Sequence, residues 1–494
     1  MDVVIIKPGD QRRIYGELSS FELTAIEPPL WSALLAGCLR AQGYAVSLLD
    51  AEVEGWSPEQ AAEQVAVLRP TLTVVSVSGS NPSASTMGMT AAGQLLQSLR
   101  NREPSLKIIL HGLHPSALPE RSLREDPVDF VCEGEGFYTL PALLEVLRAK
   151  QSAFESVPGL WYWQNGEARK TQAAPLFASL DELPLPAWDL LPMLRYRAHN
   201  WHCLDCLDQR QPYGVVYSSL GCPYSCSFCC INAIFGKPGI RYLSAELVVA
   251  QVDFLVQNYG VRNIKIIDEL FGINEERVVD ICDRLIERKY DLNCWAYARV
   301  NTVTPLMLDK MRQAGIRWIA YGFESGNARV LKDVNKRYDL ETTDRIVEMT
   351  RSSGLYILAN YIVGLPEDDF DSMQDTLNQA FHINAEWLNI YAATAYPGSA
   401  LYKEACDRGW ALPENWAAYS PYAFDAIPLP TRHLNAKQVL AFRDYAFHAY
   451  HENPRYLERI QSVFGNAAAR HIKQMSAHRL KRKYAEQYGD YECN

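Results

Sequence analysis

Short apolar runs alternate with amphipathic segments along the first 150 residues. The runs cover residues 3–7, 44–49, 72–77, 107–110 and 128–131. Between the first two runs, apolar side chains return at helical spacing at Leu34, Leu35, Cys38 and Leu39, and Gly43 follows where a helix would end. Alternating strands and helices predict a doubly wound, Rossmann-like α/β domain, in which ligands bind beyond the carboxyl ends of the parallel strands.

The same alternation returns between residues 208 and 400. Strands are predicted from residue 215 and over residues 263–267, 294–298, 318–323, 356–363 and 387–393. Helix signals separate them, such as Asn274 as an N-cap and Thr304-Pro305 before a helix that stops at Gly315. Six strand–helix units predict a partial (β/α)6 barrel of the TIM type, whose reactive groups gather at the carboxyl ends of the strands.

The segments outside these two α/β regions give a linker and a C-terminal region, so the chain is expected to have four parts. The turn Asn165-Gly166 predicts a hairpin, and a proline-rich strap follows it. An aromatic stretch at residues 408–429 is a candidate lid for the barrel, and the last helix is expected to carry a basic run, either a solvated face or a dock for an acidic substrate. We expect a Rossmann-like domain at 1–150, a hairpin and linker at 151–207, the barrel at 208–400 and a mostly helical region at 401–494.

Composition narrows the class of protein. The chain has 494 residues and a net charge of −10, which argues against a general nucleic-acid-binding protein. No apolar run is long enough to span a bilayer, and the first residues enter a strand without a secretion signal. Twelve scattered cysteines do not form a dense disulfide framework in a chain of this length. These features predict a cytoplasmic protein.

Three cysteines form the most distinctive motif. Cys222, Cys226 and Cys229 follow a predicted strand with three and then two residues between them. Gly221 and Pro223 make this segment a loop. Three thiolates on one loop can hold an iron–sulfur cluster, and a cubane held by three cysteines leaves one iron open for a substrate or cofactor.

A second pair of cysteines, Cys203 and Cys206, precedes this loop. The pair could complete a zinc site with the loop, although no further pair stands at zinc-ribbon spacing downstream. Because the pair is close in sequence to the loop, a contact with substrate at the mouth of the active site is a second hypothesis.

Polar residues and one glycine stand at the ends of most strands of the predicted barrel. They are Asp268, Glu269, Arg299, Glu324, Asn360 and Gly364. A zwitterionic ligand over the barrel mouth would explain the charged ones, because arginine pairs with carboxylates and carboxylates accept hydrogen bonds from ammonium and hydroxyl groups. The alternative is that each residue caps a strand end in water.

The cysteine spacing, with Phe228 directly before the third cysteine, resembles the radical S-adenosylmethionine (SAM) superfamily. The resemblance implies a [4Fe-4S] cluster held by Cys222, Cys226 and Cys229, with the amino and carboxylate groups of SAM on its open iron. It also implies an electron donor such as flavodoxin or ferredoxin, whose electron cleaves SAM to a 5′-deoxyadenosyl radical.

The strand-end motifs fit the same family. Residues 267–271, with Asp268 and Glu269, stand where the family holds the amino group of SAM. The fourth-strand residues 321–326, with Glu324, and the glycine-containing residues 361–367 resemble further SAM-contacting motifs. The resemblance therefore makes these strand ends, together with Phe228, Arg299, Asn360 and Gly364, candidate cofactor contacts.

Loops of the N-terminal domain resemble the cobalamin (B12)-binding domain that precedes the radical SAM domain in one subclass. The candidate contacts are Ser78, Gly79, Ser80, Asn81, Gly112, His114, Pro115, Glu133, Gly134 and Glu135. The Asp-x-His-x-x-Gly motif is absent, which implies that no histidine ligates the cobalt. The alternative is a flavodoxin-like domain that binds nothing or another cofactor.

The resemblance implies a cobalamin-dependent radical SAM enzyme. Its expected activity is methyl transfer from methylcobalamin to an unactivated carbon, or a phosphinate, of a small-molecule substrate. One alternative is an oxidative enzyme similar to the anaerobic magnesium-protoporphyrin ester cyclase, without net methylation. An alternative of another class is a cofactor-binding regulatory protein.

Overall fold

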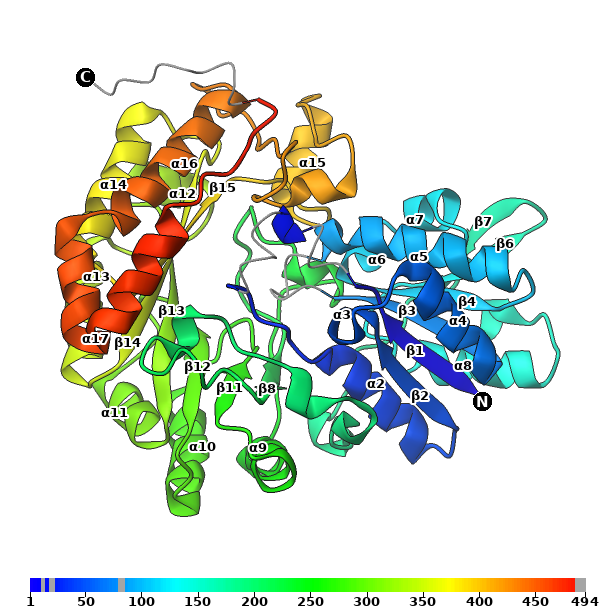
Figure 1. Cartoon of the computed structure of the whole chain (residues 1–494). Coiled ribbons are helices and arrows are strands. Elements are labelled where there is room, and N and C mark those ends of the chain that lie inside the picture. Colours follow the sequence, from blue (N-terminus) through cyan, green and yellow to red (C-terminus); the bar gives the residue numbers. More distant parts are fainter. Residues whose placement is uncertain (10–13, 17–22, 79–84, 485–494) are drawn as a thin grey trace.

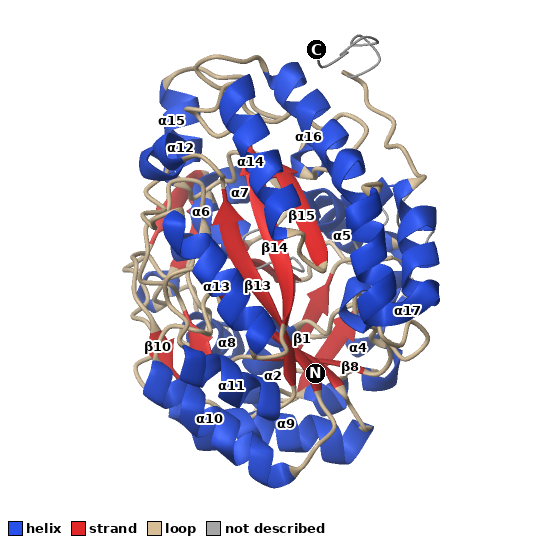
Figure 2. Ribbon diagram, turned by 90° about the vertical axis from the view of Figure 1, so that its left-hand side faces the viewer, coloured by secondary structure: helices blue, strands red, loops and turns tan. Residues whose placement is uncertain are grey.

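Two large β-sheets, one mainly and one wholly parallel, lie side by side in the computed structural model, and helices pack against both (Figures 1 and 2). The structure describes residues 1–9, 14–16, 23–78 and 85–484. The N-terminal sheet and the barrel sheet meet along the carboxyl ends of their strands, and the C-terminal helices pack beside the barrel. The predicted fold class is confirmed.

The N-terminal sheet has the strand order β2-β1-β3-β4-β5-β6-β7. Its first five strands are parallel, and β6 and β7 are antiparallel, so the predicted hairpin extends this sheet. The strands are β1 (Val3–Lys7), β2 (Val46–Asp50), β3 (Leu72–Val77), β4 (Ile108–Gly112), β5 (Phe130–Cys132), β6 (Leu160–Gln164) and β7 (Glu167–Lys170).

Helices pack on both faces of this sheet. They are α2 (Leu30–Ala41), α3 (Ala51–Glu54), α4 (Pro58–Leu68), α5 (Met89–Arg102), α6 (Leu113–Ala117), α7 (Pro119–Glu125) and α8 (Thr139–Arg148). The α4 helix begins with a capping box in which Ser57 and Gln60 satisfy each other's backbone N–H groups. The strands β1 and β3 are buried along their whole length, as expected for a parallel sheet covered on two faces.

The barrel sheet consists of six parallel strands in the order β15-β14-β13-β12-β11-β8. The strands are β8 (Tyr213–Val216), β11 (Asn263–Ile266), β12 (Asn293–Ala298), β13 (Ile316–Glu324), β14 (Tyr356–Val363) and β15 (Trp387–Ala392). The helices between them are α9 (Ala245–Tyr259), α10 (Glu275–Arg288), α11 (Pro305–Gln313), α12 (Ala328–Asp333), α13 (Glu341–Ser352) and α14 (Phe370–Ile383). Asn274 and Thr304 cap their helices as the sequence predicts.

The C-terminal region contains α15 (Ala400–Asp407), α16 (Ala436–His451) and α17 (Pro454–Ser476), and α16 packs against β15. The predicted basic face of the last helix is partly wrong, because α17 ends at Ser476 and the residues that follow are not helical. Arg482 is buried and pairs with Asp444 at 2.8 Å, so it stabilises the contact with α16 and does not face solvent.

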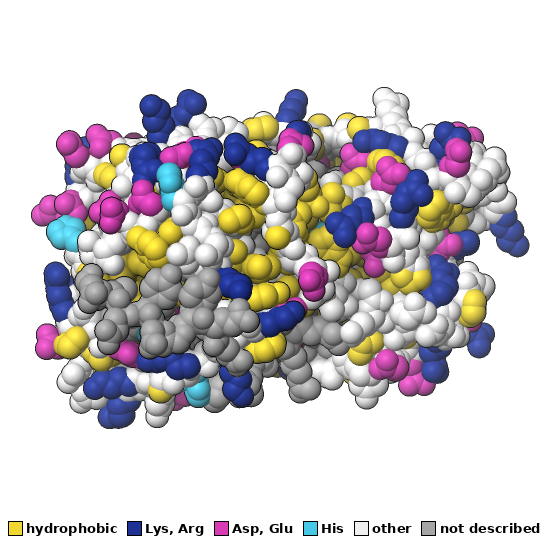
Figure 3. Space-filling model, turned by 90° about the horizontal axis from the view of Figure 1, so that it is seen from above, with side chains coloured by type: hydrophobic (Ala, Val, Ile, Leu, Met, Phe, Trp, Pro, Cys, Tyr) yellow, Lys and Arg dark blue, Asp and Glu magenta, His cyan; other side chains and the backbone are white. Residues whose placement is uncertain are grey.

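Two ion pairs join the two halves of the molecule. Lys265 on β11 pairs with Glu27, which precedes α2, at 2.9 Å, and Arg241 pairs with Glu135 at 2.5 Å. Seen from above, hydrophobic side chains gather near the middle of the molecule (Figure 3). No helix in the described residues is long and apolar enough to cross a membrane.

Candidate active site

The cysteine loop lies at the carboxyl end of β8. A two-residue strand, β9 (Ser219–Leu220), pairs with β10 (Arg241–Tyr242) and fixes the start of the loop. Gly221 has a φ of 92°, and a Cβ there would lie 2.5 Å from the carbonyl oxygen of Gly239, so the loop requires glycine at this position.

The three thiols of the loop are close enough to affect one another. Burial, and then the thiols of Cys222 and Cys226, raise the pKa of Cys229 to about 12. Burial also raises the pKa of Cys222. A bound metal would favour the thiolate forms, because metal ligation requires deprotonated sulfur. Among the described residues, no three His, Cys, Asp or Glu side chains are grouped as ligands of one metal ion.

Asp268 holds the residues that lead into this loop. The carboxylate is fully buried and accepts hydrogen bonds from the backbone N–H of Ser218 at 2.6 Å, from the hydroxyl of Ser219 at 2.6 Å and from the Ser218 hydroxyl. These contacts hold the end of β8 against the end of β11. Asp268 is therefore a positioning residue for the cysteine loop in this structure.

The side chain of Glu269, the next residue, lies on the wall of two cavities. One carboxyl oxygen accepts a hydrogen bond from the backbone N–H of Gly221 at 3.0 Å. The other oxygen is buried and has no partner among the described residues. Burial raises the pKa of Glu269 to about 8. The side chain lines both of the cavities described below, where an ammonium group would satisfy its unpaired oxygen.

Arg299 stands next to the cysteine loop at the end of β12. Nη1 lies 3.5 Å from the sulfur of Cys226, Nη2 donates to the carbonyl oxygen of Lys336, and the guanidinium lies 3.9 Å from the ring centre of Tyr224. The guanidinium is therefore held in a fixed orientation in which a carboxylate could be bound.

Glu324 ends β13 with its backbone in the left-handed region, at a φ of 62°, and beside a shift in strand register. Its carboxylate pairs with the buried Lys336 at 2.6 Å. Strained backbone of this kind concentrates at functional sites. Glu324 and Lys336 both line the first cavity.

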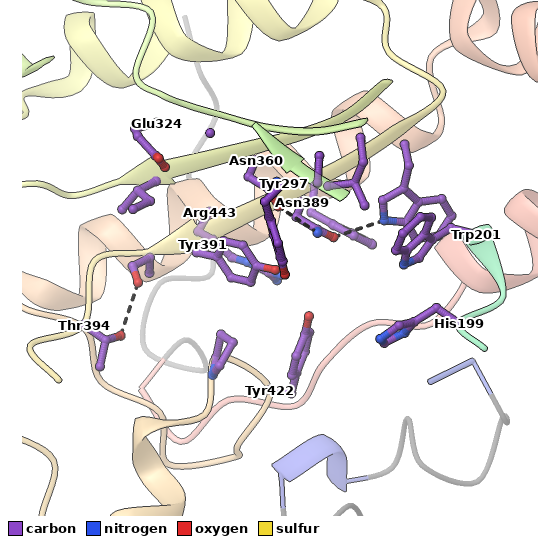
Figure 4. Close-up of a pocket in the computed structure, with 18 of the residues that line it drawn as sticks. His199, Trp201, Tyr297, Glu324, Asn360, Asn389, Tyr391, Thr394, Tyr422 and Arg443 are labelled. Atoms are coloured by element: carbon purple, nitrogen blue, oxygen red, sulfur yellow. Dashed lines mark hydrogen bonds between the residues drawn. The ribbon is translucent and has the colours of Figure 1, made fainter. Parts of the chain in front are cut away.

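The first cavity, of about 450 Å³, runs along the inner face of the barrel sheet. Cys229, Phe228, Arg299 and Glu324 lie at one end, which we call the cluster end. Figure 4 shows the remainder of the wall, where Tyr297, Tyr391, Tyr422, Trp201 and His199 surround the space. The presence of Tyr422 means that the aromatic C-terminal stretch covers part of this cavity, as its composition suggests.

Asn360 lies on the wall of the first cavity in a chain of hydrogen bonds across β14 and β15. The indole N–H of Trp387 donates to Asn389, whose amide donates to Asn360 at 3.0 Å, and Asn360 donates to the carbonyl oxygen of Tyr321. Gly364, by contrast, has a φ of 80° and packs against Val439 of α16. The described contacts of Gly364 are therefore structural.

The second cavity, of about 80 Å³, lies where the two sheets meet. The N-terminal strand ends contribute Lys7, Ser78, His111 and Gly112, and the barrel contributes Glu269. Gly112 is required by packing, because a Cβ there would lie 2.2 Å from the carbonyl oxygen of Val77. The predicted contacts Gly79, Ser80 and Asn81 lie outside the described residues.

His111, which sequence reasoning did not select, lines the second cavity, whereas the selected His114 turns away from it. Nδ1 of His114 lies 3.1 Å from the hydroxyl of Thr86, and its ring packs edge-on against Trp416. Nδ1 of His111 is buried without a hydrogen-bond partner in the described structure. Burial lowers the pKa of His111 to about 4, which leaves a neutral ring able to accept a hydrogen bond.

The other selected residues of the N-terminal domain make protein contacts. Glu133 pairs with Lys170 and accepts a hydrogen bond from the indole N–H of Trp161, so its side chain is bound to the hairpin. Glu135 pairs with Arg241 of the barrel, and the N–H of Gly134 donates to Ser116. Pro115 is buried within α6. In the described structure these four residues do not line the second cavity, and Glu135 joins the N-terminal domain to the barrel through Arg241.

Cys203 lies at the opposite end of the barrel strands from the cysteine loop. Its thiol contacts the side chain of Asn263, the first residue of β11, at 3.4 Å, and burial raises the pKa of Cys203 to about 12. Cys206 contacts Asp208 at 3.5 Å. The hypothesis that this pair contacts substrate at the active-site mouth is therefore wrong, because strand direction places the pair at the amino ends.

Comparison with known families agrees with this geometry. Residues 216–380 match the radical SAM superfamily, and residues 21–144 match the B12 binding domain. The chain is therefore a B12-binding radical SAM protein, and it is an enzyme of that class. The expectation from the cysteine motif is confirmed, and the alternative of a regulatory protein is set aside.

Curated relatives cover most of the chain. An uncharacterized methyltransferase, PH0819 from Pyrococcus horikoshii, is 28% identical over 88% of this chain and 90% of its own length. The anaerobic magnesium-protoporphyrin IX monomethyl ester cyclase of Rubrivivax gelatinosus is 27% identical over 78% of this chain and 68% of its own. A cytidylyl-2-hydroxyethylphosphonate methyltransferase from Streptomyces wedmorensis is 25% identical over 81% of this chain and 82% of its own length.

Two solved structures share the fold. The cobalamin-dependent radical SAM enzyme OxsB, solved with aqua-cobalamin and SAM, has a TM-score of 0.70 at 18% identity, covering 96% of this chain and 72% of its own. The methyltransferase TsrM from Kitasatospora setae, solved with tryptophan substrate and a SAM analogue, has a TM-score of 0.67 at 15% identity, covering 96% and 98%.

Proposed function

We propose that the chain is a B12-dependent radical SAM methyltransferase that methylates an unactivated carbon, or a phosphinate, of a small molecule. Two of the relatives named above are methyltransferases, and one of them aligns over 90% of its own length. In such enzymes the cluster and SAM supply a 5′-deoxyadenosyl radical, and methylcobalamin supplies the methyl group. The protein's part is to bind these groups, orient them and exclude water.

The residues at the cluster end fit this chemistry. Cys222, Cys226 and Cys229 would hold the [4Fe-4S] cluster, because their thiols share one loop and influence one another. Arg299 would bind the carboxylate of SAM, and Glu269 would accept hydrogen bonds from its amino group. Phe228 borders the same space and would pack against the ligand.

The second cavity, of about 80 Å³, is too small for a whole corrin and is the candidate contact site for one edge of cobalamin. Ser78, Gly112 and His111 come from the carboxyl ends of β3 and β4, where ligands of such sheets bind. His111 would accept a hydrogen bond from a carboxamide of cobalamin through its unpaired Nδ1. Gly79, Ser80 and Asn81 lie outside the described residues and remain predicted contacts.

One observation carries the proposal. Glu269 combines a buried oxygen that has no partner in the described structure with a position on both cavities, directly beside the cysteine loop. Such an oxygen is costly unless a ligand satisfies it. A positively charged ligand between the cluster loop and the N-terminal domain is what SAM would provide.

The test uses protein purified and reconstituted without oxygen, with iron, sulfide and cobalamin. Incubation with SAM and a strong reductant should yield 5′-deoxyadenosine together with S-adenosylhomocysteine, because SAM also remethylates reduced cobalamin. The C226A variant should form no 5′-deoxyadenosine. Failure of the wild type to form S-adenosylhomocysteine would reject the methyltransferase proposal.

An oxidative cyclase is the second candidate, because the curated cyclase aligns over 78% of this chain. It predicts 5′-deoxyadenosine without S-adenosylhomocysteine in the same experiment. For either activity we propose a cytoplasmic location and an electron donor such as flavodoxin or ferredoxin. Reduction of the bound cluster by purified flavodoxin would test the donor.

A further inference from the structure

Three tyrosine hydroxyls converge in the middle of the first cavity. Tyr297 comes from β12, Tyr391 from β15 and Tyr422 from the C-terminal stretch that covers the barrel. Figure 4 shows the three rings pointing toward a common space. We call this part of the cavity the tyrosine end, as distinct from the cluster end at Cys229 and Arg299.

The three hydroxyls are available to a ligand. No hydrogen bond to any of them is found within the described part of the chain, although each ring is half-buried. Burial, followed by the neighbouring phenols of Tyr422 and Tyr297, raises the pKa of Tyr391 well above its usual value. The groups therefore stay neutral and can both donate and accept hydrogen bonds.

The charged groups at the tyrosine end already have partners within the protein. Lys265 pairs with both carboxylate oxygens of Glu27, at 2.9 and 3.1 Å. Arg443 shares Asp444 with Arg482, at 2.9 and 2.8 Å, and donates to the carbonyl oxygen of Ile390. A charged ligand would have to compete with these partners and give up its hydration, which is costly in an enclosed space.

Aromatic rings form the rest of this wall. Trp201, Trp295 and Trp387 line the cavity and pack beside the inner face of the sheet. The indole N–H groups of Trp295 and Trp387 already donate, to Tyr213 and Asn389. These rings therefore offer apolar faces suited to stacking on another ring rather than polar groups that need partners.

We propose that the tyrosine end binds the methyl acceptor, and that this acceptor is an uncharged, ring-containing molecule with hydroxyl or carbonyl oxygens. The rings would stack against the tryptophans, and the oxygens would exchange hydrogen bonds with Tyr297, Tyr391 and Tyr422. Only the description of the ligand as the methyl acceptor rests on the proposed function. Its neutral, cyclic character follows from the wall itself.

The test compares two probes with one ring system. Reconstituted holoenzyme with SAM is titrated anaerobically with 2-naphthol, which is neutral, and with 2-naphthoate, which is anionic, by calorimetry at pH 7. We expect 2-naphthol to bind at least tenfold more tightly. Y391F and Y422F keep the rings and remove one hydroxyl each, so each should weaken binding of 2-naphthol about fivefold. Y445F, which alters an exposed tyrosine of α16, serves as the control and should bind as the wild type does.

Three results would overturn the proposal. They are tighter binding of 2-naphthoate, no binding of 2-naphthol at millimolar concentration, and unchanged affinity in both Y391F and Y422F. The formation of S-adenosylhomocysteine is measured in the same preparations without probe. Loss of that product alone would count against the methyltransferase, whereas loss of probe selectivity alone would count against the neutral ligand.

Discussion

Nη1 of Arg299 lies 3.5 Å from the sulfur of Cys226, which joins the third barrel strand to the middle of the cysteine loop. The same guanidinium stacks on Tyr224 within that loop. The contact thus connects a residue expected to bind SAM with a residue expected to bind iron.

The first prediction concerns the cluster ligands. Replacing Cys226 by alanine should abolish the iron–sulfur absorbance after reconstitution, because two cysteines hold such a cluster poorly. Bound cobalamin should remain, since its candidate site lies on the N-terminal domain. Cys206→Ser is the matched control and should keep the full spectrum. An unchanged cluster spectrum in C226A would refute the ligand assignment.

The second prediction concerns protons released by SAM. Burial raises the pKa of Glu269 to about 8, so at pH 7 its carboxyl is mostly protonated before SAM binds. The sulfonium charge of SAM favours the ionised form of Glu269, so binding should release close to one proton from Glu269, beside the proton that the iron-bound amino group loses, and should strengthen as the pH rises toward 8. Calorimetry in buffers of different ionisation enthalpy counts the released protons. E269Q should release about one proton fewer than the wild type, and equal release by both proteins would contradict the assignment.

The same shift affects stability in a defined direction. Unfolded chain loses the Glu269 proton near pH 4.5, whereas the folded protein keeps it to about pH 8. The free energy of unfolding should therefore fall as the pH rises through this window, and E269Q should reduce the slope. Denaturant unfolding at several pH values measures it.

The third prediction concerns the ion pair between the two halves. Lys265 and Glu27 are both almost fully buried. Lys265→Met leaves the Glu27 carboxylate without this cation and should lower the free energy of unfolding by about 3–5 kcal/mol. The double variant K265M/E27Q removes both charges and should recover much of that loss. Equal destabilisation of the single and double variants would show that the pair itself is unimportant.

The fourth prediction compares two glycines that share left-handed backbone. Gly364 has a φ of 80°, and a Cβ there would lie 2.2 Å from Val439, while Gly260 has a φ of 64° and open space around it. G364A should cost about 3 kcal/mol because strain and a clash with α16 add together, whereas G260A should cost about 1 kcal/mol. Thermal unfolding of both variants checks the difference.

Sequence patterns predicted the elements well because burial dictates them locally. The apolar runs of β1 and β3 and the caps Asn274 and Thr304 each depend on a few neighbouring residues. The direction of side chains at the strand ends could not be predicted in the same way. Asp268 and Glu269 are adjacent, yet one turns back to the serines of the cysteine loop and the other faces both cavities.

Sites assembled from distant segments could not be read from local sequence. Tyr297, Tyr391 and Tyr422 are separated by up to 125 positions and meet only because the sheet curves and the C-terminal stretch returns over it. His114 is a predicted contact and His111 is not, although the two are only three positions apart, at the end of β4 and in α6. The Thr86 and Trp416 contacts that turn His114 away come from other parts of the chain.

The carboxyl group of Glu269 borders both cavities, which are suited to different ligands. A positively charged ligand in one cavity favours loss of the Glu269 proton. The other cavity is then bordered by a carboxylate anion instead of a neutral carboxylic acid. Filling one cavity therefore alters the electrostatic field in the other. Binding of the two ligands is therefore coupled through one proton on Glu269, without any movement of one domain against the other.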